Sequence, residues 1–170
     1  MSCLMIATLS ASLAAIAWQQ SLDNHRKESL AELYRFRKGL DSLLDRHKYL
    51  PGLLAQHSLL SNALANESGL NPQQQANQFL EEVRHVTESD TIYLMNKAGT
   101  TISSSDWRSN NSFVGRNFSF RPYFTQAIKN GNGQYFALGT TSLKRGYYFS
   151  RAIYQGADAI GVVVVKVDLS

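Results

Sequence analysis

The sequence predicts an α+β domain in which the helices come first and an antiparallel sheet follows. Up to about residue 87, apolar residues recur every three or four positions, which is the period of an amphipathic helix. After Ser89-Asp90 the pattern changes to short runs rich in β-branched and aromatic residues, which is typical of strands. Short turns join most of these runs, so we expect five antiparallel strands, interrupted by a loop and one short helix.

Residues 1–22 carry no charge, and their most apolar part runs from Cys3 to Trp18. This part is slightly shorter than the ~20 residues that span a bilayer. Three interpretations stay open: a transmembrane helix with Trp18 at the interface, a signal peptide without the usual basic start, or a buried globular helix. We expect a transmembrane helix or the remnant of one. Because Cys3 is the single cysteine, no internal disulfide framework or cysteine-based metal site is expected.

Residues 23–70 are predicted to hold a long stalk helix over 23–49 and a second helix over 52–65. The long helix has one apolar stripe, formed by Leu30, Leu33, Phe36, Leu40, Leu43, Leu44 and Leu50. This stripe fits either packing against the domain or pairing with a second copy, but it lacks the charge pattern of a long coiled coil. Pro51 separates the two helices. The second helix should turn one side inward: Leu53, Leu54, His57, Leu60 and Leu64.

Residues 71–170 are predicted to form the folded module. Asn71-Pro72 is a typical helix start, and this third helix should run to about Thr87. Its inward residues should be Ala76, Phe79, Leu80, Val83 and Val86. Strands are expected over 91–96, 100–104, 134–141, 146–155 and 159–168. Pro122 fits the first turn of a short helix over 121–129, between the second and third strands.

The positive charge of the protein is concentrated near its C-terminal end. Residues 118–170 hold six basic and two acidic residues, whereas the other 117 residues hold eleven of each sign. The net charge of +4 therefore comes from this segment. A local positive excess beside aromatic and hydroxyl side chains indicates a site for a small anion.

Two cations and one polar loop are the candidates for this site. Lys166 interrupts the apolar run of the last strand, so it either points to water at a fraying strand end or enters a pocket and meets an anion. Arg121 precedes Pro122 at a helix start, where anions are favoured, although a surface charge is the simpler interpretation. Gly139 and the threonines after it fit an ordinary polar turn or a loop that a ligand approaches closely.

Catalysis and nucleic-acid binding are disfavoured. The sequence has no G-x-S-x-G motif, its four histidines have no metal-ligand spacing, and NGNG at 130–133 lacks the Lys-Ser/Thr of a phosphate loop. Tyr147, Tyr148 and Phe149 on a basic sheet could stack bases, but successive strand residues alternate faces and make no single platform. An RNA-binding module is therefore only a remote alternative.

Two overlapping segments carry a family resemblance: SDWRSNNSFVGRNFSFRPYF and SFRPYFTQAIKNGNGQYFALGTTSLKRGYYFSRAI. Both resemble the periplasmic domain of the C4-dicarboxylate sensor histidine kinases of the DctB type. The resemblance spans roughly residues 20–170 and is most specific over 104–168. It implies a PAS-like (PDC or double-Cache) sensor module over 71–170, distal to the membrane. It also implies a bacterial inner-membrane protein with this module in the periplasm, and a homodimer formed through the long N-terminal helix.

The resemblance also implies the ligand and its contacts. The ligand would be succinate, fumarate or malate, with Arg121 and Lys166 facing its two carboxylates. Further hydrogen bonds are expected from Tyr123, Thr140, Thr141 and Ser104. Weaker candidates for the wall of the site are Trp107, Gly139, Tyr148 and Ser150.

In such proteins a dimeric histidine kinase follows the sensor and phosphorylates a response regulator, and this kinase region would use ATP and Mg²⁺. None of the four histidines resembles a phosphoacceptor motif, and no ATP-binding box is present. We therefore expect residues 1–170 to bind a ligand without catalysis and without a cofactor. A chemoreceptor ectodomain, or another Cache receptor for a different small carboxylate, is the alternative with the same fold.

Overall fold

The computed structural model describes residues 2–65, 71–139 and 144–169, and it describes side chains from Trp18 onward, except those of residues 21–24. The chain divides into two compact units, residues 1–43 and 44–170.

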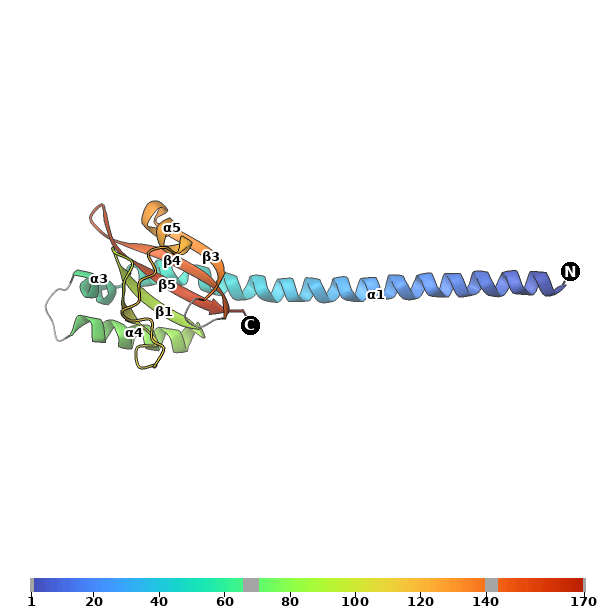
Figure 1. Ribbon diagram of the computed structural model, residues 1–170, viewed down its shortest axis with the longest axis horizontal. Coiled ribbons are helices and arrows are strands. Elements are labelled where there is room, and N and C mark those ends of the chain that lie inside the picture. The colour runs from blue at the N-terminus through green and yellow to red at the C-terminus, as the bar shows by residue number, and fades with distance from the viewer. Residues whose placement is uncertain (1, 66–70, 140–143, 170) are drawn as a thin grey trace. The chain divides into compact units, whose positions relative to one another are not determined.

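The first unit consists of helix α1 (Ser2–Lys48), whose last turn belongs to the second unit (Figure 1). This helix includes the one predicted for residues 23–49. Three residues of its apolar stripe, Leu30, Leu33 and Phe36, are 58 to 73% exposed. Among the described residues, no helix has both the length and the hydropathy needed to cross a membrane. The interpretation of residues 1–22 as a membrane span stays a prediction.

The second unit begins with two short helices, α2 (Leu50–Leu54) and α3 (Ser58–Ala65). The prediction of one helix over 52–65 is wrong. The chain turns between them, where the backbone N–H of His57 donates to the carbonyl of Leu54, and the His57 ring caps α3 by accepting from the N–H of Leu59 at 3.3 Å. This break also turns Leu53 outward, and it is 69% exposed rather than inward as predicted.

Helix α4 (Pro72–Thr87) starts as the sequence predicts. The Asn71 side chain accepts a hydrogen bond from the backbone N–H of Gln74, while Asn71 itself has a left-handed backbone, which asparagine tolerates better than most residues. The helix packs on β1 and β2 through Ala76 and Leu80. Val86 points away from that face and is 84% exposed, so its predicted inward position is wrong.

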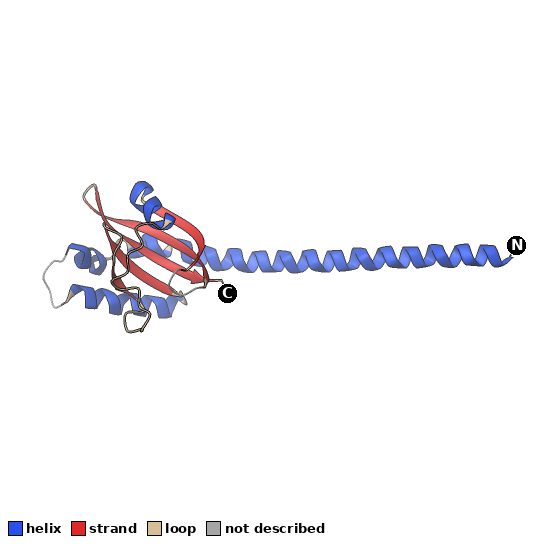
Figure 2. Ribbon diagram, in the orientation of Figure 1, coloured by secondary structure: helices blue, strands red, loops and turns tan. Residues whose placement is uncertain are grey.

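The sheet has five antiparallel strands in the order β2-β1-β5-β4-β3 (Figure 2), which confirms the predicted α+β class. The strands and the short helix α5 have the following bounds: β1 Thr91–Asn96, β2 Thr101–Ser104, α5 Pro122–Asn130, β3 Asn132–Leu138, β4 Arg145–Gln155 and β5 Asp158–Asp168. Strand β5 lies at the centre, and its residues 162–165 are completely buried. The predicted strand 134–141 in fact begins at Asn132 and ends at Leu138.

Each face of the sheet has its own cover. Helices α2, α3 and α4 contact one face, where Leu64 of α3 packs against Gly161 of β5. Helix α5 and the loop before it cover the other face, which carries Tyr93, Tyr148 and Val164 in one apolar core. Figure 1 shows α5 and α4 on opposite sides of the sheet. The face under α5 is also the face of Lys166, because strand residues alternate sides.

Candidate anion-binding site

Three tyrosines lie in the apolar layer between the sheet and α5. Tyr93 comes from β1, Tyr148 from β4, and Tyr123 from the first turn of α5, where Pro122 fixes the start of the helix. The hydroxyl of Tyr93 donates to that of Tyr123 at 2.8 Å, and the rings of Tyr123 and Tyr148 stack with their centroids 4.9 Å apart. All three side chains are buried. They bring hydroxyl groups into an otherwise apolar layer.

Burial raises the pKa of all three phenols above the ordinary value, because the phenolate form would lose its hydration. The Arg121 guanidinium opposes this effect and lowers the pKa of each phenol, as a nearby positive charge does. The tyrosines are therefore neutral hydrogen-bonding groups at physiological pH. The charge of Arg121 acts on each of them.

Arg121 is the residue before α5 and has the extended backbone that a following proline favours. Its side chain is half-buried, and its guanidinium donates a hydrogen bond to the Leu138 carbonyl at 3.1 Å. The guanidinium also lies over the ring of Phe120, 5.5 Å from the ring centroid. These contacts direct Arg121 toward the end of β3, beside Gly139.

Lys166 lies on β5 and is completely buried. The interpretation that it points to water at a strand end is wrong. Its ammonium group forms an ion pair of 2.5 Å with Oδ2 of Asp90, and the backbone N–H of Asp90 donates to the Lys166 carbonyl at 3.0 Å. Gly146 on the adjacent strand makes room for the lysine stem, since a Cβ there would lie 3.1 Å from its Cε. In this arrangement the anion that meets Lys166 is a carboxylate of the chain itself.

Tyr148 lies between the two cations. It is the cross-strand partner of Lys166 on one side, and on the other it lines a small cavity with Arg121 and Gly139. Among the described residues, its other walls are Tyr93, Phe113, Phe118 and Tyr123. Its volume is about 10 Å³, close to the least that holds one water molecule. A four-carbon diacid therefore requires this region to widen.

The other predicted site residues lie as follows. Ser104 is buried on β2 opposite Tyr93 and donates to a carboxylate oxygen of Asp106 at 2.5 Å. Ser150 donates to the carbonyls of Tyr123 and Gly133 at 2.8 and 3.1 Å, which ties α5 to β3 and β4. Thr140 and Thr141 lie outside the described residues.

Trp107 is not brought to the cavity. Its indole N–H donates to Glu81 on α4 at 3.0 Å, and Arg108 stacks on its ring at 4.4 Å. The structure thus brings Arg121, Tyr123, Gly139 and Tyr148 together, places Lys166 beside them, and holds Trp107 against α4.

Asp90 and Tyr93 lie at the site but were not among the residues predicted from the sequence. Asp90 directly precedes β1 and Tyr93 lies within it, and they reach the site because β1 pairs with β5, where Thr91 is opposite Lys166. Strand alternation within residues 91–96 predicts which residues share a sheet face with Tyr93. It does not predict that β1 pairs with β5, which is what brings Tyr93 near Arg121 and Lys166. A carboxylate placed just before a strand was the only available signal for Asp90.

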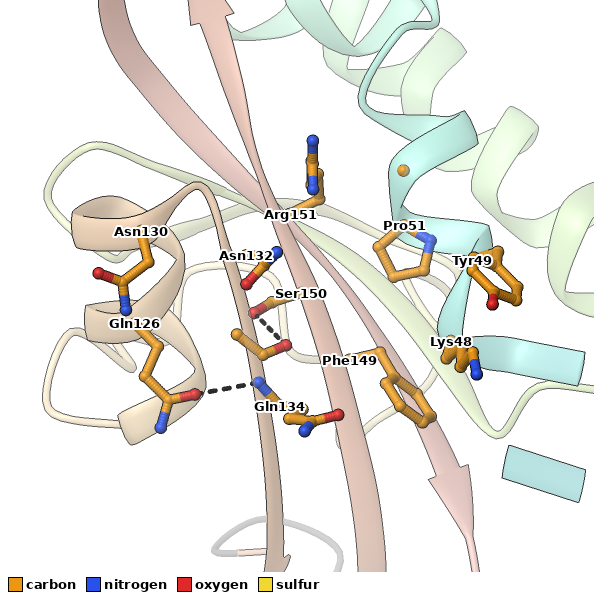
Figure 3. A pocket seen from close by; sticks show the side chains of 12 residues that line it. Lys48, Tyr49, Pro51, Gln126, Asn130, Asn132, Gln134, Phe149, Ser150 and Arg151 are labelled. Atoms are coloured by element: carbon orange, nitrogen blue, oxygen red, sulfur yellow. Dashed lines mark hydrogen bonds between the residues drawn. The ribbon is translucent and has the colours of Figure 1, made fainter. Parts of the chain in front are cut away.

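Two larger hollows contain neither Arg121 nor Lys166. One of about 520 Å³ has walls from the α1–α2 junction, α5, β3 and β4, and one of about 730 Å³ lies beside α2 and α3. In Figure 3, β3 and β4 run between the α5 side chains and those of Lys48 and Tyr49. Gln126 is already bonded to the N–H of Gln134 at 3.0 Å. The polar groups of this hollow do not converge on one point.

Comparison with known proteins places this geometry in a family. The chain is 40% identical over 171 residues to the C4-dicarboxylate transport sensor protein DctB of Pseudomonas aeruginosa, which covers 96% of the chain. The chain is homologous to the DctB sensor region. DctB of Rhizobium meliloti is 32% identical over 163 residues, covering 94% of the chain. No family model matches the chain.

The fold agrees with the sequence match. The crystal structure of the V. cholerae DctB sensor domain superimposes with a TM-score of 0.79 and 39% identity, covering 85% of this chain and 56% of that one. The predicted PAS-like (PDC) sensor fold is therefore confirmed. The chain spans 28% and 24% of the lengths of the two curated DctB proteins.

Proposed function

We propose that the chain is the extracytoplasmic sensor domain of a two-component histidine kinase and that it recognises C4-dicarboxylates such as succinate, fumarate and malate. The observation that carries this proposal is the completely buried Lys166 on the sheet face that α5 covers. A buried ammonium group requires an anionic partner; Asp90 supplies it here, and a ligand carboxylate would supply it in the complex. Lys166 stands next to Tyr148, which separates it from Arg121. The similarity to the DctB sensor proteins supports the same ligand class.

Two separated cations suit a dicarboxylate better than a monocarboxylate. One carboxylate would bond to Arg121, whose planar fork accommodates both oxygens, and the other to Lys166. Tyr123, Tyr148 and the hydroxyl groups of Ser104, Thr140 and Thr141 would contribute neutral hydrogen bonds. Each charge-assisted hydrogen bond contributes about 1.5–3 kcal/mol net. A monocarboxylate would leave one cation without its ligand partner, which is a source of selectivity.

The exposed stripe of α1 supports the predicted homodimer. Leu30, Leu33 and Phe36 form an apolar row that a second copy of the helix would cover. The sensor would stand in the periplasm of the bacterial inner membrane and pass its signal to a kinase region, which would use ATP and Mg²⁺ and act on a response regulator. The chain itself would bind its ligand without catalysis and without a cofactor.

Isothermal titration calorimetry with succinate tests the proposal. Arg121→Ala and Lys166→Ala should each abolish measurable binding, while the exposed Lys129→Ala, with the same loss of charge, should bind as the wild type does. Circular dichroism shows whether each variant is folded. Undiminished affinity in both site variants would reject this site. A thermal-shift screen of small organic acids then identifies the preferred ligand, because a specific binder raises the melting temperature.

A further inference from the structure

Asp90 holds Lys166 from two sides. It lies in the turn between α4 and β1, where its carboxylate pairs with the Lys166 ammonium and its backbone N–H donates to the Lys166 carbonyl. Thr91 adds a longer hydrogen bond of 3.4 Å to the same carboxylate oxygen. Lys166 is completely buried, whereas the Asp90 side chain is 28% exposed. The aspartate can therefore reach water by turning its side chain, and the lysine cannot.

The charges of the site do not match a dianion while Asp90 stays in place. Arg121 and Lys166 supply two positive charges, and Asp90 cancels one of them. Two carboxylates close to one ammonium group repel each other where little water screens them. The cavity beside Tyr148, at about 10 Å³, must also widen before a diacid enters. The charges balance if the ligand carboxylate takes the place of the Asp90 carboxylate at Lys166. The widening of the cavity is a separate change of the residues around Tyr148.

We propose that Asp90 is a built-in competitor for Lys166, which sets the affinity of the site and turns toward solvent when a dicarboxylate binds. This inference rests on the proposed function and adds a residue that tunes it. Asp90 keeps the lysine charge compensated until the ligand replaces it. Removing the aspartate carboxylate therefore strengthens ligand binding, because the ligand no longer has to displace it.

The turn that carries Asp90 also holds the end of α1. His47 is buried in the last turn of α1, and its Nε2 lies 3.0 Å from the carbonyl oxygen of Thr87, three residues before Asp90. Arg46, also in the last turn of α1, forms an ion pair of 3.4 Å with Glu88, the residue after Thr87. Displacement of Asp90 thus acts on a turn that α1 contacts directly. This contact gives ligand binding a short route to the helix.

Calorimetry with succinate on the whole chain tests the competition. Asp90→Asn keeps the size of the side chain and removes its charge, and it should lower the dissociation constant at least tenfold relative to wild type. Asp158→Asn is the matched control, since it makes the same change of net charge at an exposed aspartate at the opposite end of β5 from Lys166. Its dissociation constant should change by less than twofold. Asp90→Glu keeps a carboxylate and should stay near wild type.

The outcomes separate this inference from the proposed function. Wild-type binding with an equal or weaker dissociation constant for Asp90→Asn overturns the competition and leaves the dicarboxylate site standing. Absence of succinate binding in both wild type and Asp90→Asn overturns the proposed function and the inference together. If Asp90→Asn does not fold, Asp90→Ser is the second neutral variant.

Discussion

The ion pair between Lys166 and Asp90 should respond very differently to the loss of each partner. The lysine is completely buried, and the aspartate side chain is 28% exposed. Asp90→Ala removes the carboxylate that pairs with this buried ammonium group. Lys166→Met removes that charge, fills a similar volume with apolar atoms, and leaves a carboxylate that water can reach.

The magnitudes follow from this asymmetry. Breaking a buried pair so that one charge stays uncompensated costs about 3–5 kcal/mol, while replacing a buried charged residue by an apolar one of similar volume is often neutral or stabilising. We expect Asp90→Ala to lose about 3–5 kcal/mol and Lys166→Met to change stability by about 1 kcal/mol or less. For a unit the size of residues 44–170, the first loss lowers the melting temperature by on the order of 10–20 °C.

Urea denaturation followed by circular dichroism measures both variants and the double variant Asp90→Ala/Lys166→Met. The double variant should recover most of the stability that Asp90→Ala loses, because no buried charge remains. Equal destabilisation by the two single variants, or no recovery in the double variant, would refute the assignment of Lys166 as the buried partner of the pair.

Three further predictions concern the packing around the site. Ser150→Ala should cost about 0.5–1.5 kcal/mol in urea denaturation, because the hydroxyl that donates to the Tyr123 and Gly133 carbonyls is lost. It should leave succinate affinity within twofold, and a large loss of affinity would instead make Ser150 part of the wall. Gly146→Ala should lower the free energy of unfolding by about 1–3 kcal/mol and weaken succinate binding, because the new Cβ would lie 3.1 Å from the Cε of Lys166. Unchanged stability and affinity would contradict this packing. The three buried tyrosines have raised pKa values, so their phenols stay protonated in the folded protein at a pH where they ionise in the unfolded chain. Their contribution to the free energy of unfolding should be constant below pH ~10 and fall above it by about 1.4 kcal/mol per pH unit per tyrosine. Thermal melts between pH 8 and 11 measure this, and a flat profile would argue that the phenols are hydrated.

Features that depend on neighbouring residues could be predicted from the sequence. Asn71-Pro72 and Pro122 fix the starts of α4 and α5 through local backbone chemistry, and both helices begin where expected. Alternation likewise gave the sides of β5 and so put Lys166 on one face with the buried valines. The break between α2 and α3 has a weaker signal, because it depends on a histidine ring that caps the second helix.

The contacts of the candidate site depend on tertiary structure instead. That Lys166 is buried follows from the central place of β5, and that Asp90 is its partner follows from the pairing of β5 with β1. Neither is visible in a pattern of nearby residues. Trp107 illustrates the opposite error, since an aromatic residue in a polar loop suggested the wall of a site, and its indole in fact bonds to Glu81 on α4.

A crystal structure of the chain with succinate is the most direct test of the two-cation site. We predict one carboxylate within hydrogen-bonding distance of the Arg121 guanidinium, the other at the Lys166 ammonium, and Asp90 turned toward solvent. Succinate bound only in the 520 Å³ hollow beside Phe149, or bound with neither carboxylate at Lys166, would contradict the account.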